Sequence, residues 1–279
     1  MSYSQERKPG VSVEFGDRVF IVFMADEEER ILDPIQRAKP DRIYLFIYES
    51  ESYDRNYENH YPNIEKGIKE VNQKTKIIKK YVTFINYFEV IHELSKIIKK
   101  EREKNPNTEI IMHCGVGSKI SAIAVIDACR IWNAKPIYVY SKDYDPKRDI
   151  KHKGEMILFE PPVFPLQKEK WEHIETIRII DNMIKKNREQ NRYTTGDKDY
   201  IMKSDIQDAL LKAKIITTSG KKNTKNIQSR QQMALKQKIL DPLKKRGYIE
   251  LRKKSRSKKV YLTAEGRRIA EIFKYYNPR

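Results

Sequence analysis

The chain has 279 residues, enough for two domains of ordinary size, because folded units cluster around roughly 100–200 residues each. Hydrophobic residues make up 39% of it, and apolar blocks such as residues 18–23 are long enough to build a core, which excludes disorder throughout. No run approaches the roughly 20 apolar residues of a membrane helix, and the first residues lack the apolar run of a secretory signal. We therefore expect a cytoplasmic protein without a membrane partner.

The net charge of +18 is concentrated near the end of the chain. Residues 201–279 contain 22 Lys and Arg against 6 Asp and Glu, a net charge of +16, whereas the first 200 residues carry only +2. A solvated Lys-rich surface is the alternative, but thermophilic proteins with such surfaces balance Lys with Glu. Because acidic residues are scarce here, the composition favours a polyanionic partner.

Cysteine and histidine usage argues against disulfides and structural metals. The two cysteines, Cys114 and Cys129, fall on neighbouring elements of one buried unit, where a reduced thiol behaves as a small apolar side chain. The five histidines lack the short spacings by which one helix or loop presents several metal ligands. We expect neither a disulfide framework nor a metal, and no cofactor.

Short β-rich runs alternate with helical runs over the first part of the chain. The expected strands are residues 18–24, 42–48, 76–82, 109–114, 135–140 and 155–160, and the expected helices are residues 28–38, 64–73, 87–104 and 118–132. This alternation is typical of a mostly parallel sheet covered by helices on both faces. It predicts a Rossmann-like, doubly wound α/β domain.

The helix expected over residues 118–132 has almost no polar face. It must therefore be covered on both sides. The sheet can cover one side, and the same helix of a second subunit could cover the other, which favours a homodimer. A covering segment of the same chain is the alternative.

After residue 165 the alternation stops. A helix expected over residues 167–190 leads into the polar stretch 191–199. We therefore expect a first domain over residues 1–165, a linker helix and hinge over residues 166–199, and a second domain over residues 200–279.

The last 80 residues have the element order of a winged helix-turn-helix, an α+β domain. Ser204 and Gln207 have the spacing of a capping box for a helix over residues 205–213, and a second helix over residues 226–246 contains Pro242, which predicts a kink. Residues 248–252 and 259–262 alternate apolar with polar residues around a basic tip, as in a β-hairpin. A final helix follows residue 263.

A glycine-rich turn joins the fourth strand to the apolar helix. Its residues are Cys114, Gly115, Val116, Gly117, Ser118 and Lys119. The glycines allow a tight turn at the carboxyl end of a parallel strand, and the following helix offers unpaired N–H groups to an anion, to which the Ser118 hydroxyl and Lys119 add donors. It is not an ATP-binding Walker A loop, because Ile120 occupies the position that requires Ser or Thr. A turn without any ligand is the alternative.

The turn after the first strand, with Ala25, Asp26 and Glu27, should lie on the same rim. Acids in a first helical turn are usually cap and dipole partners. If this turn touches a ligand, we expect the backbone groups of residues 24–26 to do so rather than the carboxylates. A metal site is not expected, because these carboxylates are consecutive rather than convergent.

These two turns, with the segments 26–34 and 38–44, resemble the CRISPR-associated Rossmann-fold (CARF) regulators that carry a C-terminal winged helix. The resemblance spans nearly the whole chain. It implies a dimer whose sensor domains bind cyclic oligoadenylate across the two-fold axis, in antiviral defence. By match, the ligand loops are residues 25–28 and 114–119.

In a winged helix, the helix before the hairpin enters the major groove and the wing follows the phosphates. Arg and Gln can pair with guanine and adenine edges, which gives the base-reading candidates Arg230, Gln231, Gln232, Lys236 and Gln237. The candidates for phosphate contact are Lys253, Lys254, Arg256, Lys258 and Lys259. A winged helix used for protein contact is the alternative.

The sequence thus predicts a transcription regulator that binds double-stranded DNA and responds to a cyclic oligoadenylate, not an enzyme. One alternative is a slow nuclease that cuts its own cyclic ligand, with Ser118 and Lys119 stabilising charge, although no general base stands out. A regulator of the same type with an unrelated metabolite is the other.

Overall fold

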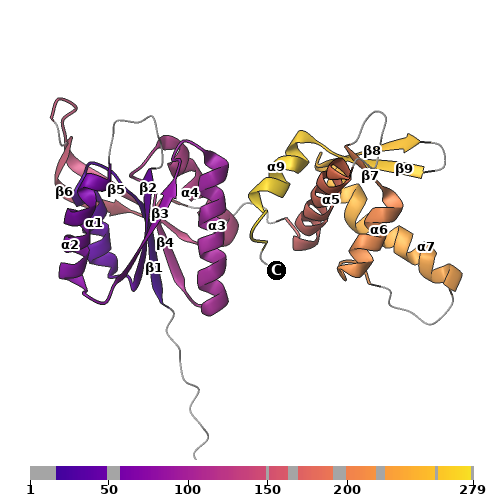
Figure 1. Ribbon diagram of the computed structural model, residues 1–279, viewed down its shortest axis with the longest axis horizontal. Helices are drawn as coiled ribbons and strands as arrows, with labels where there is room; N and C mark the ends of the chain where they lie inside the picture. The colour runs from indigo at the N-terminus through magenta and orange to yellow at the C-terminus, as the bar shows by residue number, and fades with distance from the viewer. Residues whose placement is uncertain are drawn as a thin grey trace, which may run out of the picture. The chain divides into compact units, whose positions relative to one another are not determined.

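The computed structural model describes residues 17–48, 57–148, 151–162, 169–190, 199–217, 224–254 and 257–277 (Figure 1). The chain divides into two compact units between residues 164 and 165, except that Ile91–Lys96 is grouped with the second unit. Each unit is therefore described by itself. Within the described ranges, no helix is both long enough and apolar enough to cross a membrane.

The first unit is built on a six-stranded sheet with the order β3-β2-β1-β4-β5-β6. The strands are β1 (Arg18–Phe23), β2 (Arg42–Tyr48), β3 (Lys76–Val82), β4 (Glu109–His113), β5 (Lys135–Tyr144) and β6 (His152–Phe159). The first five run parallel, and β6 pairs antiparallel with β5. This is the strand order of a doubly wound Rossmann-like sheet, as the sequence predicted.

Helices cover both faces of this sheet, α1 and α2 on one side and α3 and α4 on the other (Figure 1). They are α1 (Glu28–Ala38), α2 (Tyr61–Val71, after the 3-10 turn η1 at Tyr57–His60), α3 (Tyr87–Lys104) and α4 (Lys119–Trp132). Because β1 lies at the centre between these layers, its residues 19–23 are fully buried.

The second unit is a small helical bundle with a three-stranded sheet in the order β7-β9-β8. Its elements are α5 (Trp171–Glu189), β7 (Tyr200–Met202), α6 (Lys203–Lys212), α7 (Thr224–Ala234), η2 (Leu235–Leu240), α8 (Asp241–Lys245), β8 (Ile249–Lys254), β9 (Ser257–Leu262) and α9 (Ala264–Ile272). The order helix, strand, two helices and hairpin is that of a winged helix. Strand β7 was not expected from the sequence.

Helix α5 falls within the range that the sequence assigned to a linker, but it packs into the core of the second unit. Its buried residues Ile177, Ile180 and Ile184 belong to the same apolar cluster as residues of α6, η2 and both hairpin strands. The expected capping box of Ser204 did not form: α6 begins at Lys203, and Ser204 Oγ hydrogen-bonds its neighbour Asp205 instead. The reason is the short strand β7, which ends at Met202, so that the helix starts two residues earlier than expected.

The kink expected at Pro242 takes the form of a π-helical segment, η2, between α7 and α8. Proline has no N–H to donate to the carbonyl of Lys238, four residues earlier. The Nε2 atom of His173 on α5 instead lies 2.9 Å from that oxygen. A buried imidazole therefore partners a carbonyl that the proline leaves without its α-helical donor.

The start of α9 requires a glycine at position 266, in the first turn of the helix. Thr263 caps the helix, because its Oγ1 accepts a hydrogen bond from the N–H of Gly266 at 3.0 Å. A Cβ atom on Gly266 would lie 2.1 Å from the carbonyl oxygen of Tyr248. Only glycine lets the helix approach the hairpin this closely.

Candidate functional site

The acidic turn after β1 and the glycine-rich turn after β4 lie side by side at the switch point of the first sheet. Strands β1 and β4 are neighbours, with Ile21 paired to Met112, and their connections leave towards opposite faces. In open α/β sheets, ligands bind at the carboxyl ends of such a pair of strands. The predicted ligand-binding residues 25–27 and 114–119 therefore lie at this switch point, and they form the candidate ligand site.

Gly117 has the backbone conformation that makes this turn possible. Its φ angle is +91°, in the region that L side chains rarely adopt. A Cβ atom at this position would also lie 3.0 Å from the Cβ atom of Phe23 and 2.8 Å from Ser121 Oγ. The absence of a side chain is what lets the β4–α4 turn approach the end of β1.

Ser118 is the N-cap of α4 rather than a free donor. Its hydroxyl accepts a hydrogen bond from the N–H of Ser121 at 3.0 Å and donates to the carbonyl of Phe84 at 2.7 Å. Lys119 differs, because its side chain is exposed and pairs with no carboxylate in the described part of the chain. The first amides of α4 and the Lys119 ammonium are thus the groups that can face an anion here.

The remaining turn residues are held in place by protein contacts. Val116 is buried, and the thiol and N–H of Cys114 both donate to the carbonyl of Ile137. Asp26 is exposed and Ala25 half-buried, so this side of the site presents backbone and one carboxylate. Burial raises the pKa of the Cys114 thiol to about 11, so it stays protonated at neutral pH.

Arg30, which the sequence did not identify, joins the two turns. Only 8% of this residue is exposed. Its guanidinium pairs with the carboxylate of Glu27 at 2.8 Å and donates to the carbonyl of Gly115 at 2.6 Å, with a longer contact of 3.3 Å to Val139. Glu27 therefore serves as the counter-ion of a buried arginine. It acts neither as a metal ligand nor as a general base in this arrangement.

Two histidines lie around this arginine. His113, at the end of β4, is fully buried, and neither ring nitrogen has a hydrogen-bond partner. Burial, with a smaller effect of the Arg30 charge, lowers the pKa of His113 to about 3. Burial and Arg30 also lower the pKa of His152, while Glu27, whose Oε2 lies 3.9 Å from its Nε2, opposes the shift. No three His, Cys, Asp or Glu side chains of the described residues gather as a metal site would require.

In the second unit, we call α7, η2 and α8 together the reading helix, and β8 and β9 with their tip the wing. Of the base-reading candidates, Arg230, Gln232, Lys236 and Gln237 are exposed. Gln231 is half-buried, and its Oε1 lies 3.4 Å from Nε2 of Gln207 on α6. The reading helix thus offers both Arg and Gln to a partner.

The phosphate-contact candidates of the wing do not all lie on the same face of the sheet. Lys258 is exposed, whereas the Lys259 ammonium lies 3.5 Å above the ring of Tyr200. Successive side chains of a strand point to opposite faces, so these two lysines do not act on the same surface. Lys253 and Lys254 lie on β8, and Arg256 lies outside the described residues.

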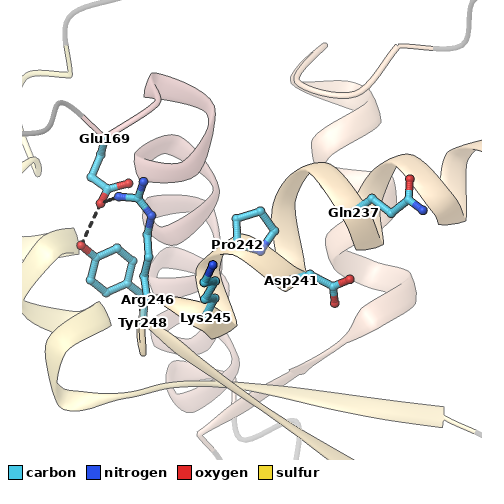
Figure 2. A pocket seen from close by; sticks show the side chains of 7 residues that line it. All are labelled: Glu169, Gln237, Asp241, Pro242, Lys245, Arg246 and Tyr248. Atoms are coloured by element: carbon cyan, nitrogen blue, oxygen red, sulfur yellow. Dashed lines mark hydrogen bonds and ion pairs between the residues drawn. The ribbon is translucent and has the colours of Figure 1, made fainter.

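An open pocket of about 720 Å³ lies between the start of α5 and the end of the reading helix (Figure 2). Glu169 forms its polar wall, and it is already engaged by Arg246 and by the hydroxyl of Tyr248 at 3.0 Å. Gln237, a base-reading candidate, lines the same pocket. The pocket walls are thus tied together by their own ion pair, which makes this a structural junction.

Comparison with known families agrees with this division. Residues 18–144 match the HFX_2341_N-like, N-terminal family model, and residues 175–274 match the DUF6293 C-terminal winged helix domain. The second domain is a winged helix. Because the matched range begins at residue 175, it includes most of α5, in agreement with the packing of that helix. No curated protein gives a significant match.

Among solved structures, the chain shows distant similarity to several proteins. Csm6 from Enterococcus italicus, bound to cyclic hexa-2'-fluoro-hexa-dAMP, is 14% identical with a TM-score of 0.39 over 46% of this chain and 34% of its own. Can2 from Sulfobacillus thermosulfidooxidans, in complex with cyclic tetra-adenylate, is 17% identical with a TM-score of 0.36 over 91% of this chain and 63% of its own. VC1899 from Vibrio cholerae is 10% identical with a TM-score of 0.37 over 91% of this chain and 64% of its own. The chain thus spans between one third and just under two thirds of these proteins.

Because His113 is buried and its ring nitrogens have no hydrogen-bond partner, we expect the free energy of unfolding to fall in acid. Its folded pKa of about 3 lies below the unfolded value of about 6.5, so the unfolded state binds the extra proton. The free energy of unfolding is therefore unaffected by His113 titration above pH 6.5, and it decreases as the pH falls from 6.5 towards 3. Between pH 7 and pH 5, the wild type should lose about 2 kcal/mol more than His113→Met in urea unfolding. Parallel pH profiles of the two proteins would contradict this account.

Proposed function

We propose that this protein is a ligand-responsive transcription regulator that binds duplex DNA through its winged helix. One observation carries the proposal: the winged helix domain falls in the segment that holds nearly all of the excess positive charge, +16 in residues 201–279. A domain of this type with such a charge suits a polyanion. The first 200 residues carry a net charge of only +2, so the excess positive charge does not extend to the sensor domain.

On DNA, the reading helix would enter the major groove and the wing would follow the backbone. Arg230 and Gln232 are exposed on α7 and can form paired hydrogen bonds with guanine and adenine edges. Lys258 on the wing would contact a phosphate and carry no sequence information.

For the sensor domain, we propose a cyclic oligoadenylate as the ligand, on the strength of the sequence resemblance and of the turns at the switch point. The positive φ of Gly117 brings backbone close to the site, the start of α4 points N–H groups at it, and Lys119 adds a cation. These groups suit a phosphodiester ring. Arg30 would support them by holding the Gly115 carbonyl.

A ring that sits on a two-fold axis needs a homodimer. Helix α4 leaves Ile120 and Ile123 exposed, 53% in the case of Ile123, beside the turn that would hold the ring. Ile85, which is 65% exposed, lies next to Phe84, whose carbonyl is bonded to Ser118. We propose that this apolar surface packs against its own copy.

We propose binding rather than cleavage of the ligand. A ring nuclease would use pocket groups to stabilise charge, and the Ser118 hydroxyl is engaged as a cap and as a donor to Phe84. Mass spectrometry of nucleotide that purifies with the protein distinguishes a cyclic oligoadenylate from an unrelated metabolite.

The full chain should bind duplex DNA with an affinity that falls steeply with salt, because each phosphate contact releases condensed counterions. Fluorescence anisotropy over a series of NaCl concentrations measures this. Arg230→Ala should weaken binding to a sequence selected from random duplexes but change binding to random duplex little. Lys74→Gln, in an exposed turn of the first unit, should change neither. An affinity independent of salt would overturn the proposal.

Calorimetry with cyclic tetra- and hexa-adenylate should find one ring per two chains. Lys119→Ala removes two cations per ring, so it should lower the affinity and its salt dependence. Gly117→Val should lower the affinity through its strained φ and the contact with Phe23, with unchanged salt dependence. Lys100→Ala, on the exposed surface of α3, is the control, and thermal unfolding confirms that each variant is folded. One ring per chain would place the site elsewhere.

Sedimentation at micromolar concentration should show a dimer. Ile123→Glu should give folded monomers, because the exposed position tolerates a charge in the monomer but not in a dry interface. Gln73→Glu adds the same charge in an exposed turn and should leave the dimer intact. A dimer that survives Ile123→Glu would exclude this face.

A further inference from the structure

Three lysines come together where the winged helix sheet meets its helices. Strand β7 ends at Met202, which pairs with Lys259 of β9 in an antiparallel register. Lys203, the next residue of the chain, therefore lies at the level of Lys258. On the other side of β9, Lys258 pairs in backbone register with residue 253 of β8.

Lys258 faces the helices. Val260 and Leu262 are buried, and because side chains alternate along a strand, Lys258 belongs to their face, whereas Lys259 points the other way. Lys236 of η2 also acts on this cluster: burial lowers the pKa of Lys203, and the charges of Lys258 and then Lys236 lower it further, opposed only by Asp241. We call Lys203, Lys236 and Lys258 the lysine triad.

The nearest acidic group that acts on the lysine triad is Asp241, which raises the pKa of Lys203 without forming an ion pair with it. None of its three ammonium groups forms an ion pair with a carboxylate in the part of the chain that the structure describes. Lys236 and Lys258 are exposed and Lys203 is half-buried, so all three side chains can be reached by a ligand. Like charges at facing positions destabilise a fold, and an anion between them removes that cost.

We infer that the lysine triad forms one binding site for a single phosphate of the nucleic-acid backbone, between the reading helix and the wing. An ammonium is a compact charge with three rotatable donors, which suits a tetrahedral oxyanion approached from three sides. The inference rests on the proposed DNA binding and deepens it. It adds Lys203 to the interface and assigns Lys236 to the backbone rather than to base reading.

Binding of the full chain to random and selected duplexes, measured by anisotropy at several NaCl concentrations, tests the site. Lys203→Gln, Lys236→Gln and Lys258→Gln should each weaken binding to both duplexes several-fold at low salt. Because they share one phosphate, the triple variant should lose about 0.9 in the slope of log K against log salt, not three times that value. Lys203→Arg keeps the charge and should retain binding.

Lys212→Gln, at the exposed far end of α6, is the matched control and should change the affinity little. If the wild type binds DNA and Lys203→Gln behaves like this control, the lysine triad is not the site, although the proposed function stands. If the wild type binds no DNA, the proposed function fails and this site fails with it. Weakening by Lys236→Gln on the selected duplex alone would make Lys236 a base reader and overturn the shared site.

NMR titration of the lysine ammonium groups gives a second measurement, the pKa of Lys203. DNA would not change this pKa if Lys203 had only a structural role. The pKa of Lys203 should rise when duplex DNA is added and also in Lys258→Gln, because both remove repulsion. A Lys203 pKa unchanged by DNA in the bound wild type would overturn the site. Removal of a repelled, half-buried charge should not lower the melting temperature, so Lys203→Gln should remain folded.

Discussion

The buried Arg30 guanidinium is the contact on which the first site depends. It starts in α1, pairs with Glu27 and reaches the carbonyl of Gly115, 85 residues later in the chain. A buried charge is costly unless it is paired and hydrogen-bonded, so the positions of both turns are fixed together. The Gly115 carbonyl is thereby turned towards the protein, which leaves the amides at the start of α4 to face outward.

Much of the fold could be predicted because it is encoded locally. Strands β2 and β3 and helices α1 and α3 have the bounds that the sequence predicted, because each begins and ends where a local apolar run or pattern does. The missed strand β7 is only three residues long and gains its partner, β9, from 60 residues further along the chain. The capping-box prediction at Ser204 was wrong for the same reason, because pairing of β7 sets the start of α6.

The sequence indicated the position of the candidate site in the fold but not the groups that support it, and ligand binding there stays a prediction. A glycine between a strand and a helix signals a tight turn, and Gly117 has the positive φ that this requires. Nothing local distinguishes Arg30 from the other charged residues around it, or His113 from any strand residue. Their roles depend on burial and on partners distant in sequence. For Lys203, the available signal was its place directly after the short apolar run Tyr200–Met202, which needs the register of β9 to be interpreted.

Under the proposed function, the two domains would bind anions by different means, and this difference follows from where their cations lie. In the first site, one exposed lysine accompanies backbone amides, which are fixed dipoles without counterions of their own. In the winged helix, the donors are mobile ammonium groups, three of which repel one another in the absence of a partner. A polyanion with condensed counterions gains more from such groups than a small ring does, because it releases its own cations on binding. Salt should therefore separate the two binding events, with DNA released at ionic strengths that leave a ring in place.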